Sequence, residues 1–193
     1  MAALARAGFD LVPLGGGSDG KAPLRKFADP LLRLQQVLGA MAGRDSSMYG
    51  IRFGGLVVLV CDVDDAELVE HLEVRFGPAA VHVRTPRGRH LWYRAPKGAL
   101  PSLRGGGLPV DVKSSPNAYV AGPGSVRPDG GCYRLVQGDL SPGALTVLHL
   151  PARESPPAES GGSVGSPRPR PGRSGVNLGL AMNWPPFRPD TRG

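Results

Sequence analysis

The sequence is poor in cysteine and has no long apolar segment. Cys61 and Cys132 are the only cysteines in 193 residues, and their spacing is not that of metal ligands. This excludes a disulfide-rich scaffold or a cysteine-based zinc site and favours a reducing, cytoplasmic compartment. No apolar run approaches the length of a membrane span, so no membrane partner is expected. The first residues are too weakly apolar to resemble a signal peptide.

A nucleotide-binding loop of the Walker type is also missing. The glycine-rich segment 15–23 contains one lysine, Lys21, but no Gly-Lys-Ser/Thr motif at the required spacing. We expect a loop here. The sequence contains no internal repeat and no zinc or helicase motif.

Positive charge is in excess, with 23 lysines and arginines against 16 acidic residues and a net charge of +7. This balance suits a polyanionic partner. From residue 152 onward Pro, Gly, Ser and Arg dominate, and such a composition cannot bury enough apolar surface to offset the entropy of ordering. We therefore predict a folded domain over 1–151 and a disordered basic tail over 152–193, whose arginines add non-specific phosphate contacts.

An apolar run at 56–60 predicts a strand buried on both faces. It leads into Asp62, Val63 and Asp64, and strand alternation would put both aspartates on one face. Two carboxylates that close repel each other unless a cation lies between them, and hard divalent ions take such oxygen ligands. The alternative is an acidic turn in which Asp65 caps the following helix.

Periodicity predicts the remaining elements. Helices are expected at 2–7, from Asp29 as N-cap with an apolar stripe that includes Leu31 and Leu38, at 66–76 and at 141–150. Strands are expected at 10–14, 49–53, 81–85, 90–94, 108–113, 118–121 and 132–136. The pairs 81–85 with 90–94, and 118–121 with 132–136, read as antiparallel. On 90–94, His90 and Trp92 share a polar, aromatic face.

Three motifs follow one another in a specific order: Cys61-Asp62-Val63-Asp64, Gly88-Arg89-His90 and Val110-Asp111. This order resembles the archaeo-eukaryotic primase superfamily, most closely its primase–polymerase branch, over roughly residues 2–150. Flanking segments such as 11–14, 20–23, 50–52, 85–93 and 119–125 resemble that family as well.

The resemblance implies an α+β fold with an N-terminal α/β unit, an RNA-recognition-like antiparallel sheet, and an active-site cleft between them. It implies template-directed nucleotidyl transfer, as primer synthesis or DNA polymerisation, with two Mg²⁺ or Mn²⁺ ions. The implied metal ligands and catalytic residues are Asp62, Asp64 and Asp111. The implied nucleotide contacts are His90, Arg52, Arg87, Arg89, Lys21 and Ser125.

The implied partners are a DNA template and primer, nucleoside triphosphates and, because no helicase motif is present, a separate replicative helicase in plasmid or phage replication. Two other functions stay open: a catalytically silent nucleic-acid-binding module with this fold, and a metal-dependent nuclease that uses the same carboxylates. Taken alone, His90 could be a packed hairpin residue and Asp111 a surface strand residue. The joint presence of the aspartates and His90 favours the active enzyme.

Overall fold

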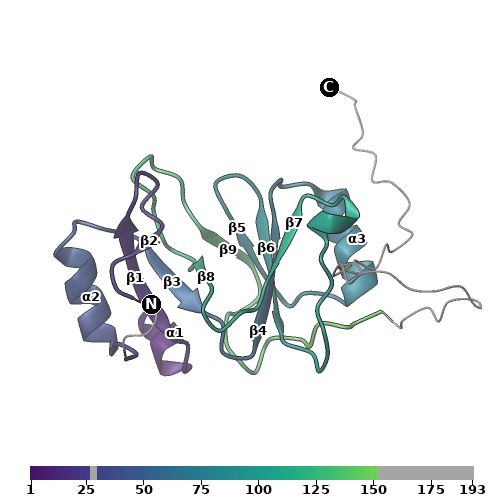
Figure 1. Cartoon of the computed structure of the whole chain (residues 1–193), viewed down its shortest axis with the longest axis horizontal. Coiled ribbons are helices and arrows are strands. Elements are labelled where there is room, and N and C mark those ends of the chain that lie inside the picture. The colour runs from purple at the N-terminus through teal and green to yellow at the C-terminus, as the bar shows by residue number, and fades with distance from the viewer. Residues whose placement is uncertain (27–29, 152–193) are drawn as a thin grey trace, which may run out of the picture.

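A computed structural model describes residues 1–26 and 30–151. It contains two antiparallel sheets that lie beside each other, with helices against their outer sides (Figure 1). The first sheet has the strand order β2-β1-β3-β8, and the second has the order β7-β4-β6-β5-β9. The expected α+β class is confirmed. No helix in the described part of the chain has the length and apolar character needed to cross a membrane.

The first sheet draws strands from both ends of the domain. Its strands are β1 (Leu11–Gly16), β2 (Ala22–Pro23), β3 (Tyr49–Arg52) and β8 (Tyr119–Ala121). The helices α1 (Ala2–Arg6) and α2 (Leu34–Ala42) lie beside this sheet, on the side away from the second sheet (Figure 1). Because β8 pairs with β3, the N-terminal unit is completed by a segment from late in the sequence.

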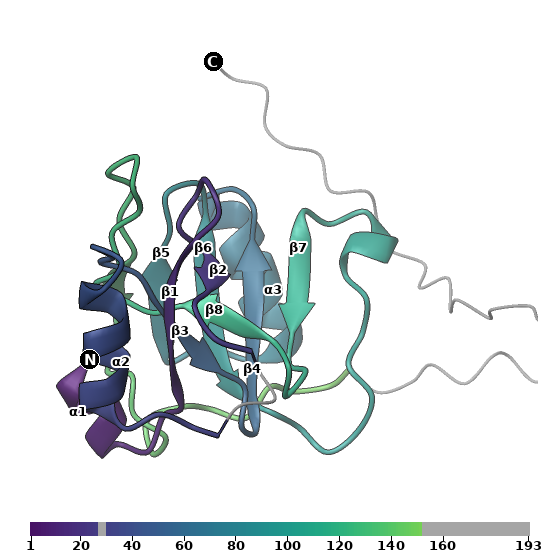
Figure 2. The same ribbon diagram turned by 60° about the vertical axis from the view of Figure 1, so that its left-hand side comes forward.

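The second sheet holds the predicted core strand. Its strands are β4 (Leu56–Cys61), β5 (Val81–Arg84), β6 (Arg89–Arg94), β7 (Val110–Lys113) and β9 (Arg134–Gln137). Helix α3 (Ala66–Phe76) covers its outer face, and β7 forms one edge of the sheet, next to β4 (Figure 2). A 3₁₀ turn, η1 (Arg104–Gly106), precedes β7.

The two faces of this second sheet bury different cores. Val57, Leu59 and Leu91 pack with helix α3, whereas Val58 and Trp92 pack with residues of the first sheet. The apolar run of β4 is therefore buried on both faces, as predicted. The core that contains Val58 and Trp92 is shared between the two sheets, so the face of β4, β6 and β7 on that side, called the inner face here, lies toward the first sheet.

Several local predictions are wrong. Helix α2 begins at Leu34 with Arg33 as its N-cap, and Leu31 and Leu38 are exposed; Asp29 lies outside the described residues. The segments 118–121 and 132–136 do not pair, because β8 joins β3 and β9 joins β5. No helix forms over 141–150, which runs as turns and extended chain. The predicted tail, 152–193, lies outside the described residues.

Candidate active site

The acidic segment after β4 forms the connection between β4 and α3. Strand β4 ends at Cys61, so strand alternation does not extend to the aspartates that follow. Asp65 is the N-cap of α3: its Oδ1 accepts hydrogen bonds from the backbone N–H groups of Glu67 at 2.8 Å and Leu68 at 3.2 Å. The capping role expected for this carboxylate is confirmed, and Asp62 and Asp64 remain available for other partners.

Asp62 and Asp111 meet at the end of the second sheet although they are far apart in sequence. Strand β7 places Asp111 opposite Val60, and the backbone N–H of Asp62 donates to the carbonyl of Pro109 at 2.9 Å. The guanidinium of Arg104 bridges the two carboxylates, with Nε donating to Asp111 Oδ1 at 2.6 Å and Nη2 donating to Asp62 Oδ2. Two carboxylates thus converge on one cation.

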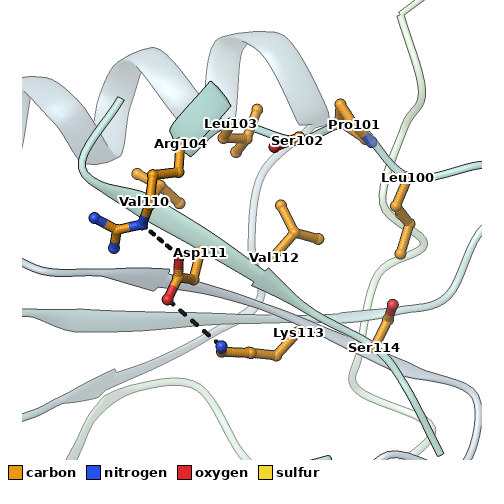
Figure 3. Close-up of a pocket in the computed structure, with 10 residues that line it drawn as sticks. All are labelled: Leu100, Pro101, Ser102, Leu103, Arg104, Val110, Asp111, Val112, Lys113 and Ser114. Carbon is orange, nitrogen blue, oxygen red and sulfur yellow. Dashed lines mark hydrogen bonds and ion pairs between the residues drawn. The ribbon is translucent and has the colours of Figure 1, made fainter. Parts of the chain in front are cut away.

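Cations hold Asp111 in its ionised form. The hydrogen bond from Arg104 is the main reason that the pKa of Asp111 is lowered, and the Lys113 ammonium lies 3.5 Å from its Oδ2. Figure 3 shows Asp111 between these two side chains, beside a pocket of about 280 Å³ that segment 100–104 and residues 110–114 line. The pocket therefore reaches Asp111, but Asp62 does not line it.

Asp64 has different partners. Arg84 Nε lies 3.0 Å from its Oδ2, and Arg89 Nη2 lies 2.7 Å from its Oδ1. These arginines are cross-strand partners on β5 and β6, on the opposite side of β4 from β7. Asp62 and Asp64 therefore belong to two separate ion-pair clusters.

The turn between β5 and β6 lies directly against the acidic segment. Thr85 Oγ1 accepts a hydrogen bond from the N–H of Gly88 at 2.9 Å, which closes the turn. A Cβ at Gly88 would overlap the carbonyl oxygen of Cys61 and lie 2.8 Å from the backbone of both Asp62 and Val63. Only glycine allows this approach. The Gly-Arg-His motif is thus in contact with the Asp-Val-Asp motif.

His90 is buried on the inner face of β6. It is 5% exposed and lies between Val60 and Val83 in the strand register, with its ring centroid 6.0 Å from that of Tyr133. Since Val60 is also the partner of Asp111, His90 and Asp111 lie on the same sheet face. The expectation of a polar, aromatic face on 90–94 rather than a buried one is wrong at His90 and Trp92, because Trp92 is fully buried as well.

The imidazole of His90 is neutral and incompletely hydrogen-bonded. Burial, together with a smaller effect of the Lys21 charge, lowers its pKa to about 4. Its Nδ1 has no hydrogen-bond partner among the described residues. Buried polar atoms usually have a partner, so this unpaired nitrogen is an exception.

The predicted basic contacts are spread around this region. Lys21 interacts electrostatically with His90, and its ammonium lies 3.3 Å from Asp19. Arg87 is exposed at the tip of the β5–β6 turn. Arg52 donates from Nη2 to the carbonyl of Pro116 at 3.4 Å, which places it on the first sheet next to β8.

Ser125 is fully buried and has a structural partner. Its hydroxyl donates to the carbonyl of Tyr49 at 3.1 Å and accepts from the N–H of Tyr49 at 3.2 Å. These bonds fix the loop after β8 to β3. In this arrangement the hydroxyl has no donor left for a nucleotide.

Three basic residues at the site were not predicted from the sequence: Arg84, Arg104 and Lys113. Arg84 and Lys113 had a local signal, because strand alternation puts each on a definite face of its strand. Arg104 had only a weak sequence signal: it is an isolated arginine followed by three glycines shortly before Val110. Its contacts with Asp62 and Asp111 could not be predicted from the sequence, because they depend on how segment 100–107 folds back on β7.

The carboxylate pair matches the ligand chemistry of a hard divalent cation. The oxygens of Asp62 and Asp111 already converge on a cation, the Arg104 guanidinium. Asp64 does not join them, and the described ranges contain no group of three or more His, Cys, Asp or Glu side chains placed to hold a metal. The pair alone therefore fits, and a third carboxylate would require the Asp64 ion pairs to open.

Comparison with known protein families gives one match. The family model described as "Bifunctional DNA primase/polymerase, N-terminal" matches residues 1–158, which is most of the chain. The match spans the three motifs and both sheets. No curated protein matches the sequence.

Proposed function

The chain belongs to the bifunctional DNA primase/polymerase family, and on this premise we propose that it carries out template-directed nucleotidyl transfer with a two-metal mechanism. Membership of the family implies an enzyme of the nucleotidyltransferase type that acts on DNA and nucleotides, and typically one that depends on metal ions. We assign nucleotidyl transfer and metal binding to particular residues of this chain.

The observation that carries the proposal is the convergence of Asp62 and Asp111 on a single cation. These two carboxylates would hold the first Mg²⁺ or Mn²⁺ ion, with Asp64 as a third ligand once Arg84 and Arg89 release it. Bound ions would supply charge neutralisation for the triphosphate and activation of the attacking 3′-hydroxyl. The protein contributes position, since β4 and β7 are hydrogen-bonded neighbours that fix the distance between Asp62 and Asp111.

His90 and the basic residues would bind the incoming triphosphate. The neutral imidazole has an unpartnered nitrogen on the same sheet face as Asp111, and Lys21 is close enough to affect its charge state. Arg87 on the adjacent turn and Arg89 at the start of β6 would add positive charge for phosphate oxygens. We keep Arg52 as a weaker candidate on the first sheet, and Ser125 would contact a nucleotide only if its bonds to Tyr49 opened.

The chain's partners in this proposal are a primed DNA template, nucleoside triphosphates and a separate replicative helicase, in plasmid or phage replication. The net charge of +7 favours DNA as the polyanion. The basic tail would add contacts that do not depend on sequence.

Primer extension tests the proposal. A labelled primer on a DNA template is incubated with Mg²⁺ or Mn²⁺ and nucleotides, using wild type, Asp62→Asn, Asp111→Asn and the exposed control Asp139→Asn. We expect extension by wild type and the control, and loss by at least about a hundredfold in the two site variants. Extension by Asp111→Asn at the wild-type rate would refute the assignment.

A silent DNA-binding module is the second candidate, and one observation favours it. All three carboxylates are satisfied by arginine side chains, so the site is electrostatically complete without a metal. DNA binding without extension, under either ion and with either type of nucleotide, would support this candidate. Metal-dependent shortening of the primer would instead indicate a nuclease.

A further inference from the structure

Arg104 occupies the position between Asp62 and Asp111 in an unusual way for a structural arginine. Its guanidinium contacts both carboxylates through two different nitrogens, yet its side chain is 53% exposed. An arginine that stabilised the core would be buried by its neighbours. This one is joined to the site mainly by its two ion pairs.

Arg104 lies in a short glycine-rich turn at the surface. Arg104 begins the 3₁₀ turn η1, and Gly105, Gly106 and Gly107 follow it. Gly107 has a φ of +87°, and a Cβ at either Gly106 or Gly107 would meet no atom of the described residues within 4 Å. The backbone of this turn is closed by hydrogen bonds from the Gly106 N–H to the Leu103 carbonyl at 3.0 Å and from the Gly107 N–H to the Arg104 carbonyl at 3.1 Å. The two ion pairs are the contacts that position the Arg104 guanidinium itself.

Without a cation, Asp62 and Asp111 would repel each other. A guanidinium relieves that repulsion in the metal-free protein, but it competes with any divalent ion that needs the same oxygens. The bidentate geometry of arginine suits a pair of carboxylates, and a lysine at this position would bridge them less well.

We propose that Arg104 is a built-in counterion that holds the Asp62–Asp111 pair in the metal-free protein and is displaced when a divalent cation binds. The inference rests on the proposed function insofar as that function assigns a metal to this pair. Arg104 then sets the metal affinity of the site, so that the free protein binds divalent ions weakly.

Direct Mn²⁺ binding tests this inference without any catalytic readout. The electron paramagnetic resonance signal of free Mn²⁺ is titrated with the full chain, in the absence of DNA and nucleotide. Arg104→Ala should bind Mn²⁺ roughly three- to tenfold more tightly than wild type, because exposed ion pairs are individually weak. Arg104→Lys should fall between the two.

Matched variants isolate the effect. Arg134→Ala removes one exposed positive charge at β9, the opposite edge of the same sheet, and should leave Mn²⁺ affinity unchanged. Adding Asp111→Asn to Arg104→Ala should cancel the gain, since one of the two carboxylates is then lost. Thermal unfolding of each metal-free variant checks that it is folded.

The outcomes separate this inference from the proposed function. Equal or weaker Mn²⁺ binding by Arg104→Ala overturns the inference while leaving nucleotidyl transfer intact. If Arg104→Ala binds Mn²⁺ more tightly and wild type extends no primer, the inference is supported and the proposed function is excluded. Absence of Mn²⁺ binding in both wild type and Arg104→Ala, with the fold intact, overturns the inference and the metal assignment together.

Discussion

Replacement of Gly88 by alanine should disturb the site without removing any catalytic group. Gly88 lies in the turn between β5 and β6, where its backbone touches the chain at Cys61, Asp62 and Val63. The added methyl group would overlap the Cys61 carbonyl oxygen and crowd the two backbone atoms that follow. Since these are backbone atoms and not the ends of flexible side chains, either the turn or the acidic segment must move.

The size of the effect follows from this geometry. Overpacking of a well-packed region typically costs about 1–3 kcal/mol, and a rigid backbone neighbour favours the upper part of that range. A shift of the segment carries Asp62 with it and changes its distance from Asp111. Misplacement by about 1 Å can reduce a rate by roughly a hundredfold. We therefore expect Gly88→Ala to lower both the free energy of unfolding and the rate of primer extension.

Urea unfolding and primer extension measure these two quantities. Gly54→Ala is the control, because a Cβ there meets no atom within 4 Å in the part of the chain that the structure describes, and Gly54 precedes the same strand, β4. If Gly88→Ala matches Gly54→Ala in both stability and extension rate, the close contact between the two motifs does not matter in solution. In that case the reasoning from the turn to the acidic segment fails.

Three further predictions concern stability and DNA binding. Burial lowers the pKa of His90 to about 4, so the unfolded chain, with an ordinary pKa of 6.5, binds the proton more readily than the folded protein does. The contribution of His90 to stability is therefore complete above pH 6.5 and is lost as the pH falls toward 4. Between pH 7 and 5, the free energy of unfolding of wild type should fall by roughly 2 kcal/mol more than that of His90→Gln. Equal losses would show that His90 is accessible to protons in the folded state. Ser125→Ala should lower the free energy of unfolding in urea by about 1–3 kcal/mol, because it leaves the Tyr49 backbone groups unpaired. The KM for nucleotide should stay constant. A raised KM at unchanged stability would restore the nucleotide role of Ser125. Truncation to 1–151 should reduce the salt dependence of DNA affinity, and equal slopes for the two lengths would exclude the tail from binding.

The elements predicted best from the sequence are those fixed by local signals. The apolar run at 56–60 forms β4, and the helix at 66–76 begins and ends as expected, with Asp65 as its cap and Gly77 at its end. The hairpin of β5 and β6 also forms as predicted. In each case the signal and the structure it specifies lie within a few residues of each other.

The elements predicted worst depend on partners far along the chain. Residues 118–121 and 132–136 both had strand patterns and lay close in sequence, which favoured a hairpin. Each finds a better partner, β3 for the first and β5 for the second, and the two end in different sheets. Short strands carry too little pattern to choose between candidate neighbours, so register and partner come from the tertiary fold.

The same distinction explains the site. The sequence indicates which carboxylates occur and in what order, but their arginine partners depend on strand register. Arg84 and Arg89 lie directly opposite each other on β5 and β6, and like charges at such a position repel. Asp64 lies within 3.0 Å of both and offsets that repulsion. Its carboxylate therefore stabilises the end of the hairpin through these two ion pairs. In the proposed function, Asp64 would become a metal ligand only if another anion took over the two arginines, and the incoming triphosphate would supply such an anion.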